Sequence, residues 1–242
     1  NVPEACLVLL PGRRHGEAIL FCRERDPERE GWDGPRLGPD GAVELLGMDD
    51  AYPISDIDDI LPGLLEGRRR VHYHLGRDAD FDLKLIGWLN RVRAQARQGA
   101  QPPQEFLELG HLLDEMRLFK SADEVKLMQR AADISVEAHR AAMRAARAGI
   151  HEYELQAEVE RVFRMHDAQP AYGSIVGVGA NACVLHYRDN RAKSRDRELV
   201  LIDAGAEYRG YAADITRTFP VNGRFCKEQR ALHDLVCAAQ AA

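Results

Sequence analysis

The sequence has little that would suit a membrane or a nucleic acid. Across its 242 residues, no run of roughly 18 or more consecutive apolar residues occurs, which excludes a membrane-spanning helix. Lys and Arg number 33 against 39 Asp and Glu, so the net charge is −6. A nucleic-acid-binding domain usually carries a strongly basic face. We therefore expect neither a membrane partner nor a nucleic-acid partner.

The sequence also lacks several motifs of covalent and nucleotide chemistry. Its five cysteines are odd in number, scattered and outside any C-x-x-C pair, which excludes a disulfide framework and a zinc-finger spacing. This use of cysteine suits a reducing compartment, and we expect the protein to be cytoplasmic. No G-x-S-x-G occurs, and the glycines between residues 173 and 179 lack the Lys-Ser/Thr ending of a phosphate loop.

The first part of the chain predicts an α/β domain, because short apolar runs alternate with helical patterns. Residues 23–41 combine charge with Gly and Pro and predict a long surface loop. The stretch 98–106 is typical of a linker, so the first domain is assigned to residues 1–110. Strands are expected over 5–10 and 17–22, joined by the turn PGRRHG, and over 70–75, with helices over 56–66 and 80–97.

The second part, residues 111–242, predicts an α+β domain in which helices are followed by antiparallel strands. Ser121 and Glu124 form an S-x-x-E capping box, which predicts that a helix begins there. One side of this helix carries Val125, Met128, Ala132, Val136, His139 and Met143. A second helix is expected over about 152–167, with Leu155, Val159, Val162 and Phe163 directed inward. Strands are expected over 174–178, 183–187, 199–205 and 211–219, and a last helix from residue 227.

Two aspartates in the second part carry the main functional argument. Asp203 ends the apolar run LVLI, and Asp214 follows eleven residues later. A hairpin that turns at Tyr208–Arg209 would place the two residues directly opposite each other on one face, with Cβ atoms about 4.5–5.5 Å apart. The run LVLI also predicts that the strand is buried on both faces.

Two carboxylates at that spacing repel each other, so something must compensate the charge. Either one carboxyl group is protonated or cations lie between them, and divalent ions bind carboxylate oxygen well. We therefore predict a divalent-metal site on this hairpin. In the alternative without a metal, Asp203 caps a turn and Asp214 pairs with Arg209 or Arg217.

Longer strings around these residues resemble a known family. The string LVLIDAGAEYRGYAADITRTFPVNGRF (199–225) is similar to the central motif of the aminopeptidase P family, in the creatinase/prolidase or pita-bread group. Similar sequences usually have a glycine in the turn before this motif, where this chain has Arg197. Further strings that resemble the family are VPEACLVLLPG (2–12), ERDPEREGWDGPRLG (24–38), DEMRLFKSADEV (114–125) and SIVGVGANACVLHY (174–187).

The resemblance implies a fold and an activity. The fold would be an α/β N-terminal domain followed by the first half of an α+β pita-bread catalytic domain. The activity would be that of a metal-dependent exopeptidase that releases the N-terminal residue from peptides with proline in second position. The family uses two divalent ions, commonly Mn²⁺, and a hydroxide that bridges them attacks the carbonyl before proline. The resemblance also implies a homo-oligomer, either a dimer or a tetramer.

Four residues match functional positions of the family. Asp203 and Asp214 match two metal ligands, and Asp214 would bridge both ions. His186 matches a histidine that contacts the substrate or stabilises the transition state. Trp32 resembles a tryptophan that reaches toward the active site of a neighbouring subunit and contacts its substrate.

The family's metal site needs five protein ligands, and this sequence matches only two of them. The other three, one histidine and two glutamates, belong to a C-terminal half that the sequence does not contain. We therefore expect the chain to be part of a longer protein, lacking the extreme N-terminus and the second half of the catalytic domain. The chain alone is expected to be inactive, because metal affinity depends on the number of ligands and on their preorganisation.

Three alternatives remain open from the sequence. A prolidase would use the same ligands but cleave only dipeptides. Creatinase belongs to the same group but does not use the two aspartates for metal, so Asp203 and Asp214 argue against it. The third alternative is a non-catalytic pita-bread module that binds peptides or protein partners.

Overall fold

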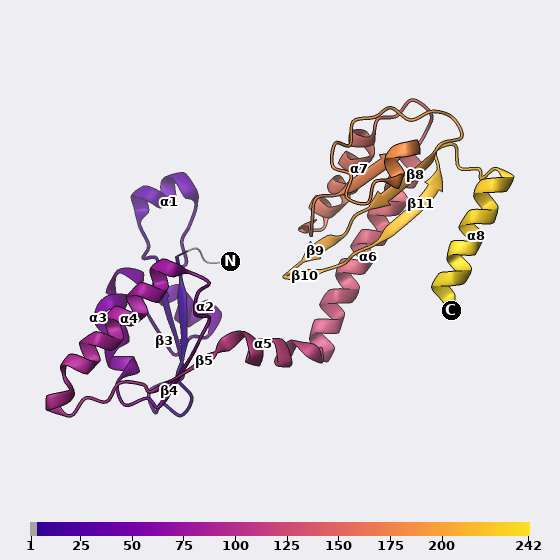
Figure 1. The fold of residues 1–242 in the computed structure, drawn as a ribbon. Helices are drawn as coiled ribbons and strands as arrows, with labels where there is room; N and C mark the ends of the chain where they lie inside the picture. Colours follow the sequence, from indigo (N-terminus) through magenta and orange to yellow (C-terminus); the bar gives the residue numbers. More distant parts are fainter. Residues whose placement is uncertain (1–3) are drawn as a thin grey trace. The chain divides into compact units, whose positions relative to one another are not determined.

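The computed structural model describes residues 4–242 as two compact units, one ending at Leu118 and one beginning at Phe119 (Figure 1). Helix α5 (Leu109–Leu118) is the last element of the first unit. The domain boundary expected between residues 110 and 111 falls inside this helix. The assignment of residues 1–110 and 111–242 to two domains stays a prediction.

The first unit is built on a three-stranded sheet with helices on both faces. Strand β1 is antiparallel to β2, and β3 is parallel to β2 on its other side. Successive side chains of a strand point to opposite faces, so Ile19 and Phe21 pack with α3 and α4, whereas Leu20 and Cys22 pack with α2. This confirms the predicted α/β layers. The elements are β1 (Cys6–Leu9), β2 (Ala18–Cys22), α2 (Gly38–Leu46), β3 (Asp50–Pro53), α3 (Ile57–Leu65) and α4 (Ala79–Ala94).

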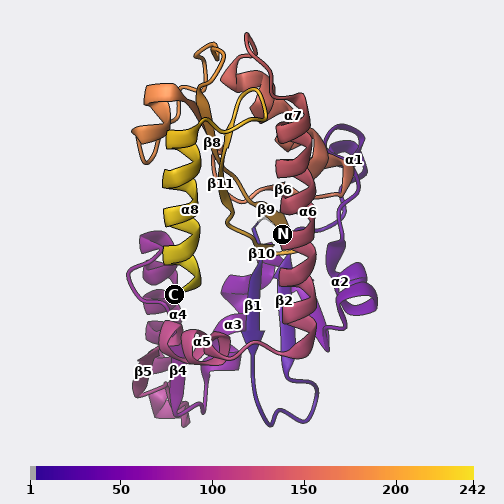
Figure 2. The same cartoon turned by 90° about the vertical axis from the view of Figure 1, so that its right-hand side faces the viewer.

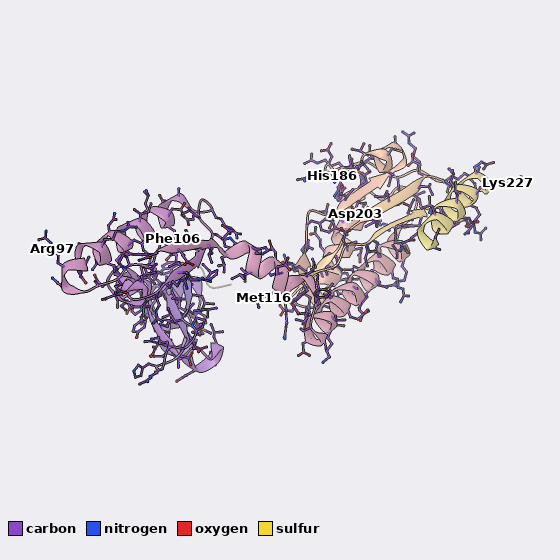
Figure 3. The ribbon with its side chains drawn as sticks, turned by 60° about the horizontal axis from the view of Figure 1, so that its bottom comes forward. Arg97, Phe106, Met116, His186, Asp203 and Lys227 are labelled. Carbon is purple, nitrogen blue, oxygen red and sulfur yellow. The ribbon has the colours of Figure 1, made fainter. Side chains whose placement is uncertain are left out.

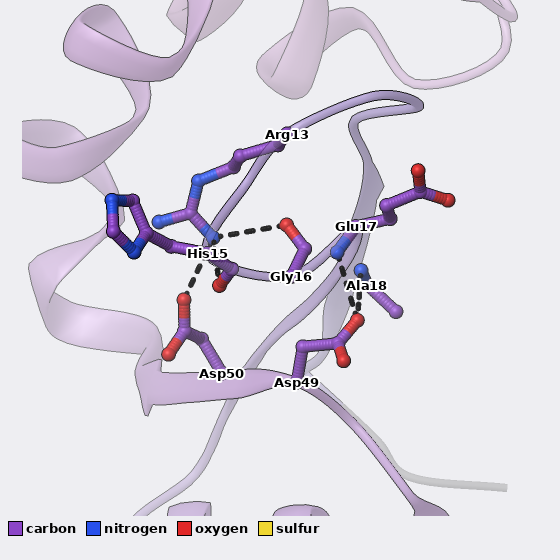
Figure 4. Close-up of polar contacts among 7 residues, drawn as sticks. All are labelled: Arg13, His15, Gly16, Glu17, Ala18, Asp49 and Asp50. Carbon is purple, nitrogen blue, oxygen red and sulfur yellow. Dashed lines mark hydrogen bonds and ion pairs between the residues drawn. The ribbon is translucent and has the colours of Figure 1, made fainter.

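The hairpin between β1 and β2 is held by two aspartates at the start of β3 (Figure 4). The carboxylate of Asp49 accepts hydrogen bonds from the backbone N–H of Glu17 at 2.8 Å and of Ala18 at 2.9 Å. These backbone donors lower the pKa of Asp49. Arg13 donates to Asp50 at 2.8 Å and to two backbone carbonyls of the turn. The predicted PGRRHG turn is therefore fixed by contacts that are distant in sequence.

The prediction of a long surface loop over residues 23–41 is wrong. The segment contains helix α1 (Pro27–Asp33) and the start of α2. Asp26 caps α1 by accepting hydrogen bonds from the backbone N–H groups of Glu28 and Arg29, and Pro27 supplies the fixed φ that suits a first helical turn. Charged residues, Gly and Pro are typical of loops, but Asp26 and Pro27 here form the start of a helix.

The linker expected over residues 98–106 contains the beginning of a strand. Strand β5 (Glu105–Glu108) pairs in parallel with β4 (Arg70–Tyr73) and forms a small second sheet in the first unit. Arg69 and Arg70 both form ion pairs with Glu105 at 2.9 Å. The Pro and Gln residues before β5 hid this pairing from the sequence pattern.

The second unit is an antiparallel α+β structure, as expected. Two three-stranded sheets have the orders β11–β8–β7 and β10–β9–β6. Helices α6 and α7 cover one face, and Figures 1 and 2 show α8 on the other side of β8 and β11. The elements are α6 (Ala122–Ala145), α7 (Glu152–Met165), β6 (Gln169–Pro170), β7 (Ile175–Val178), β8 (Leu199–Asp203), β9 (Ala206–Tyr208), β10 (Tyr211–Ala212), β11 (Thr216–Pro220) and α8 (Lys227–Ala241).

The two helices of this unit differ in how well the sequence predicted their buried faces. On α7, Leu155, Val159, Val162 and Phe163 are buried, as expected. On α6, only His139 of the expected face is buried, whereas Val125, Met128, Val136 and Met143 are exposed. The buried face of α6 carries instead Ala131, Ile134, Ser135, Ala138, Ala141 and Ala142. A pattern that weights large apolar side chains misplaces a face made mainly of alanine.

Helix α8 is the least covered element of the second unit. Its side chains Leu232, Leu235 and Val236 are exposed, and Gln229 ties its first turn to the carbonyl of Arg197 by a 2.7 Å hydrogen bond. Among residues 4–242, no helix is both long enough and apolar enough to cross a membrane.

In the turn before β8, Arg197 adopts a left-handed backbone conformation that glycine favours. Its φ is +67°, and the N–H of Glu198 donates to the carbonyl of Arg195 to close the turn. A left-handed residue other than glycine is strained by about 1–2 kcal/mol, and glycine loses part of that gain in backbone entropy. Arg197→Gly is therefore expected to stabilise the second unit by roughly 0.5–1 kcal/mol.

The measurement is a urea unfolding curve of this unit. Arg224→Gly, at an exposed loop arginine outside the residues with positive φ, is the matched control and should be neutral or destabilising. A loss of stability in Arg197→Gly equal to that of the control would contradict the strain argument.

The capping box at the start of α6 predicts a pH-dependent contribution to stability. Glu124 accepts hydrogen bonds from the N–H of Ser121 at 2.6 Å and from the hydroxyl of Tyr211 at 2.7 Å. These bonds, the backbone one first, lower the pKa of Glu124 from 4.5 to about 2. A lowered folded-state pKa stabilises above the unfolded value and is lost as the pH falls through the folded value.

Glu124→Gln should therefore be less stable than the wild type near neutral pH. The difference should shrink as the pH falls from about 4.5 to about 2. Thermal unfolding across this range measures it. Ser121→Ala keeps the carboxylate and its two larger hydrogen bonds, so its loss should change less with pH than that of Glu124→Gln. A deficit of Glu124→Gln that stays constant down to pH 2 would refute the linkage.

Candidate functional site

Three of the four residues singled out from the sequence line one pocket. Asp203, Asp214 and His186 border a cavity of roughly 280 Å³ in the second unit. Figure 3 shows His186 and Asp203 in this unit, on the loop after β7 and on β8. The other lining residues are Tyr172, Gly173, Ile175 and Arg188.

Trp32 is not among these lining residues. It lies on α1 in the first unit, and 85% of its surface is exposed. Its proposed contact with the substrate of a neighbouring subunit stays a prediction.

The aspartates share a face of the hairpin but are not directly opposite each other. The partner of Asp203 in the ladder is Thr216, and Tyr208 pairs with Tyr211. The register is therefore shifted by two residues from the expected one, because the chain turns at Arg209 and Gly210. Both have positive φ, +51° and +87°, as a two-residue hairpin turn requires. A shift of two keeps Asp214 on the same face as Asp203.

The expectation that the strand of Asp203 is buried on both faces is also wrong. Val200 and Ile202 are buried against α6 and α7, whereas Leu199, Leu201 and Asp203 are half-buried on the opposite face. Asp214 is exposed. The pocket thus opens on the face of the sheet that lies away from α6 and α7.

A glycine lets the two halves of the hairpin approach at the site. A Cβ on Gly205 would lie 1.6 Å from the carbonyl oxygen of Ala213 and 3.1 Å from the backbone nitrogen of Asp214. Flanking hydrogen bonds, Ala204 N–H to Ile215 O and Ala213 N–H to Ala206 O, hold the chains together here. The close contact at Gly205 therefore brings the backbone of Asp214 beside the end of β8.

The hydroxyl of Tyr172 lies between the two carboxylates. Its oxygen is 2.6 Å from Asp203 Oδ1 and 3.0 Å from Asp214 Oδ1. Burial first, and then the hydrogen bonds to both aspartates, raise the pKa of Tyr172 well above its usual range. The hydroxyl has one proton and can donate it to only one carboxylate. The two neighbouring carboxylates therefore share a single hydroxyl donor, an arrangement that a bound cation would stabilise.

This donor set suits a divalent cation in part. Two converging carboxylates offer the hard oxygen atoms that such ions prefer. Among residues 4–242, no group of three or more His, Cys, Asp or Glu side chains is arranged to hold a metal ion. Asp203 and Asp214 therefore fit as two ligands of a larger set.

His186 reaches the pocket from a loop, not from the strand expected over residues 183–187. A 3₁₀ turn over Gly179–Cys183 precedes it, and the N–H groups of Val184 and Tyr187 bond to carbonyls three residues back. Leu185 is 88% exposed, so the apolar residues at positions 183–185 do not form a buried strand. The ring of His186 is accessible at the pocket rim.

Sequence reasoning missed Tyr172 and Gly205. Tyr172 follows Pro170 in a segment without periodicity, so no pattern pointed to it. Gly205 stood in the hairpin, and a glycine within a strand pattern often marks a close backbone approach. The glycine at position 205 is therefore the one sequence signal that points to this contact.

Comparisons with known proteins agree with this architecture. Residues 126–242 match the model of metallopeptidase family M24, and residues 1–73 match the N-terminal domain of aminopeptidase P. Xaa-Pro aminopeptidase of Escherichia coli is 44% identical over 98% of this chain and 54% of its own length. The structure of Pseudomonas aeruginosa aminopeptidase PepP matches with a TM-score of 0.96 at 60% identity, over 99% of this chain and 55% of that one.

A further structure, zinc-substituted E. coli aminopeptidase P in complex with product, matches with a TM-score of 0.92 at 44% identity, over 98% of this chain and 55% of that one. The chain belongs to the aminopeptidase P branch of metallopeptidase family M24. It combines the N-terminal domain with part of the pita-bread domain. It spans about half the length of the curated relatives it matches.

Gly205→Ala should disrupt the paired aspartates. The added methyl cannot fit 1.6 Å from a backbone carbonyl, so the hairpin must separate locally. We expect a loss of about 2–4 kcal/mol in the stability of the second unit, the range for overpacking plus a broken ladder bond. Gly173→Ala is the control, because nothing lies within 4 Å of a Cβ there. Equal unfolding midpoints for the two variants would contradict the close approach.

Proposed function

We propose that the whole protein is a metal-dependent Xaa-Pro aminopeptidase, an exopeptidase that releases the N-terminal residue from peptides with proline in second position. The convergence of Asp203, Asp214 and His186 on one pocket carries this proposal. The family membership of the chain supports it, since relatives of the same branch are named Xaa-Pro aminopeptidases.

Each residue of the pocket has a role in the proposal. Asp203 and Asp214 would hold two divalent ions together with ligands outside this chain. When bound, such ions supply an activated water and stabilise negative charge on the substrate. Tyr172 would keep the two carboxylates directed at the same point. His186, accessible at the rim, would donate a hydrogen bond to the substrate carbonyl as charge develops there.

Finer features are part of the same proposal. Manganese is the expected metal, although a zinc-substituted form of a relative exists. Proline-containing peptides are the expected substrates in a homo-oligomer, in which Trp32 of one subunit would contact substrate in another. The large exposed surface of Trp32 supports such an intersubunit role. The isolated thiols and the acidic net charge support a cytoplasmic protein without a nucleic-acid partner.

Replacing either aspartate should abolish both activity and metal binding in the full-length protein. Asp203→Asn and Asp214→Asn are each expected to lower kcat/KM for an Xaa-Pro-Xaa tripeptide more than about 100-fold. Loss of a residue that only hydrogen-bonds a metal ligand already costs about 10–100-fold, and loss of the ligand itself should cost more. Metal content, measured by atomic emission, should fall together with the rate.

Asp196→Asn, at a carboxylate in the turn before β8, is the control and should keep wild-type activity and metal. Retained hydrolysis in both site variants would refute the metal role. Cleavage of Xaa-Pro dipeptides without cleavage of tripeptides would indicate a prolidase. A metal-free wild type without peptidase activity would indicate a non-catalytic binding module.

A further inference from the structure

One buried carboxylate ties down the loop that follows β7. Glu152, the first residue of α7, is fully buried. Its two oxygens accept four hydrogen bonds from this loop and its ends. The donors are Val178 N at 2.8 Å and Asn181 Nδ2 at 3.0 Å to Oε1, and the Tyr187 hydroxyl at 2.8 Å and Ala192 N at 2.8 Å to Oε2. We call these five residues the Glu152 cluster.

The cluster fixes the start, the middle and the end of the loop over residues 179–192. Val178 immediately precedes the loop, Ala192 is its last residue, and Asn181 lies in its 3₁₀ turn. Tyr187 is the neighbour of His186 in the chain, and its hydroxyl also accepts a 3.0 Å hydrogen bond from Asn181. His186 itself is exposed, so its position depends on how firmly Tyr187, its neighbour in the chain, is held.

A second buried polar contact supports the same loop. Asn190 donates to the carbonyl of Ser174 at 2.8 Å and to Gln156 Oε1 at 2.9 Å, and it accepts from Val176 N at 3.1 Å. Its φ of +46° is one that asparagine tolerates better than most residues. Gln156 lies one helical turn after Glu152, so α7 presents two successive anchors to the loop.

The chemistry of Glu152 requires a carboxyl group at this place. A buried polar group destabilises the fold unless it is hydrogen-bonded, and here both oxygens accept from a backbone N–H. An amide could serve only one of those two donors, since its NH₂ group would face the other. Burial, and then the hydrogen bond to Glu152, also raise the pKa of Tyr187, which keeps the phenol a donor.

We infer that Glu152 is a positioning residue for His186, acting through Tyr187 and the loop over residues 179–192. The inference rests on the proposed function, because His186 is taken to contact the substrate. Glu152 does not line the pocket, so its effect on the reaction would pass through the loop.

The test uses the full-length protein and a double-mutant cycle between Tyr187 and His186. Tyr187→Phe removes one hydroxyl but keeps both backbone contacts of Glu152. We expect it to lower kcat/KM for an Xaa-Pro-Xaa peptide about tenfold, the order of one hydrogen bond to a charged group. In the His186→Ala background, Tyr187→Phe should cost almost nothing further, since its effect acts through the missing side chain.

Hydrogen–deuterium exchange gives a readout that does not depend on activity. In Tyr187→Phe, amides of residues 179–192 should exchange faster than in the wild type, with the rest of the second unit unchanged. Tyr153→Phe is the matched control, because Tyr153 lies on the same helix, outside the Glu152 cluster, with its ring stacked on His151. The control should change neither exchange nor rate. Glu152→Gln should show the same loop-confined exchange to a larger extent, and exchange that rises throughout the unit would mark it as misfolded.

Each outcome decides the inference. The inference is supported if Tyr187→Phe lowers kcat/KM only where His186 is present, and if the loop amides exchange faster. An equal loss in both backgrounds, or unchanged loop exchange in Tyr187→Phe, overturns it while leaving the proposed function intact. If the wild type does not hydrolyse the peptide, the proposed function and the catalytic part of the inference both fail, and exchange alone then decides whether the cluster anchors the loop.

Discussion

The approach of two backbone segments at Gly205 is the constraint on which the site depends. Because residue 205 has no side chain, the segment of Ala213 and Asp214 lies directly against the end of β8. Asp203 and Asp214 then converge on the single hydroxyl of Tyr172, which cannot satisfy both. The local backbone thus places two carboxylates side by side, an arrangement that a bound divalent cation would stabilise, and the M24 family to which the chain belongs is a family of metallopeptidases.

Around this pair, the second unit divides its polar groups into two sets. The face toward α6 and α7 is apolar, whereas the opposite face carries the aspartates. Two of the buried polar residues, Glu152 with four hydrogen bonds and Asn190 with three, hold an irregular loop in place. Irregular loops suit reactive groups when a rigid scaffold positions them, and α7 provides that scaffold for His186.

The sequence was sufficient where a physical pattern is strong and local. The capping box at Ser121, the apolar face of α7 and the convergence of the two aspartates follow directly from spacing. It failed where long-range contacts decide. Residues 183–187 look like a strand but form local turns, and only Tyr187 among them bonds to Glu152. Strand β5 forms because it pairs with the edge of β4. The register of the hairpin depends on the turn at Arg209 and Gly210, which both have positive φ. The sequence alone does not distinguish this turn from one at Tyr208 and Arg209.

The central claim is that Asp203 and Asp214 are two ligands of a dinuclear metal site in the whole protein. The most direct measurement is the metal content of the purified full-length protein, by atomic emission, with its intact mass determined on the same sample. The account predicts about two divalent ions per chain, lost on chelation together with peptide hydrolysis. Full-length protein that cleaves Xaa-Pro peptides at an undiminished rate after complete removal of metal would contradict it.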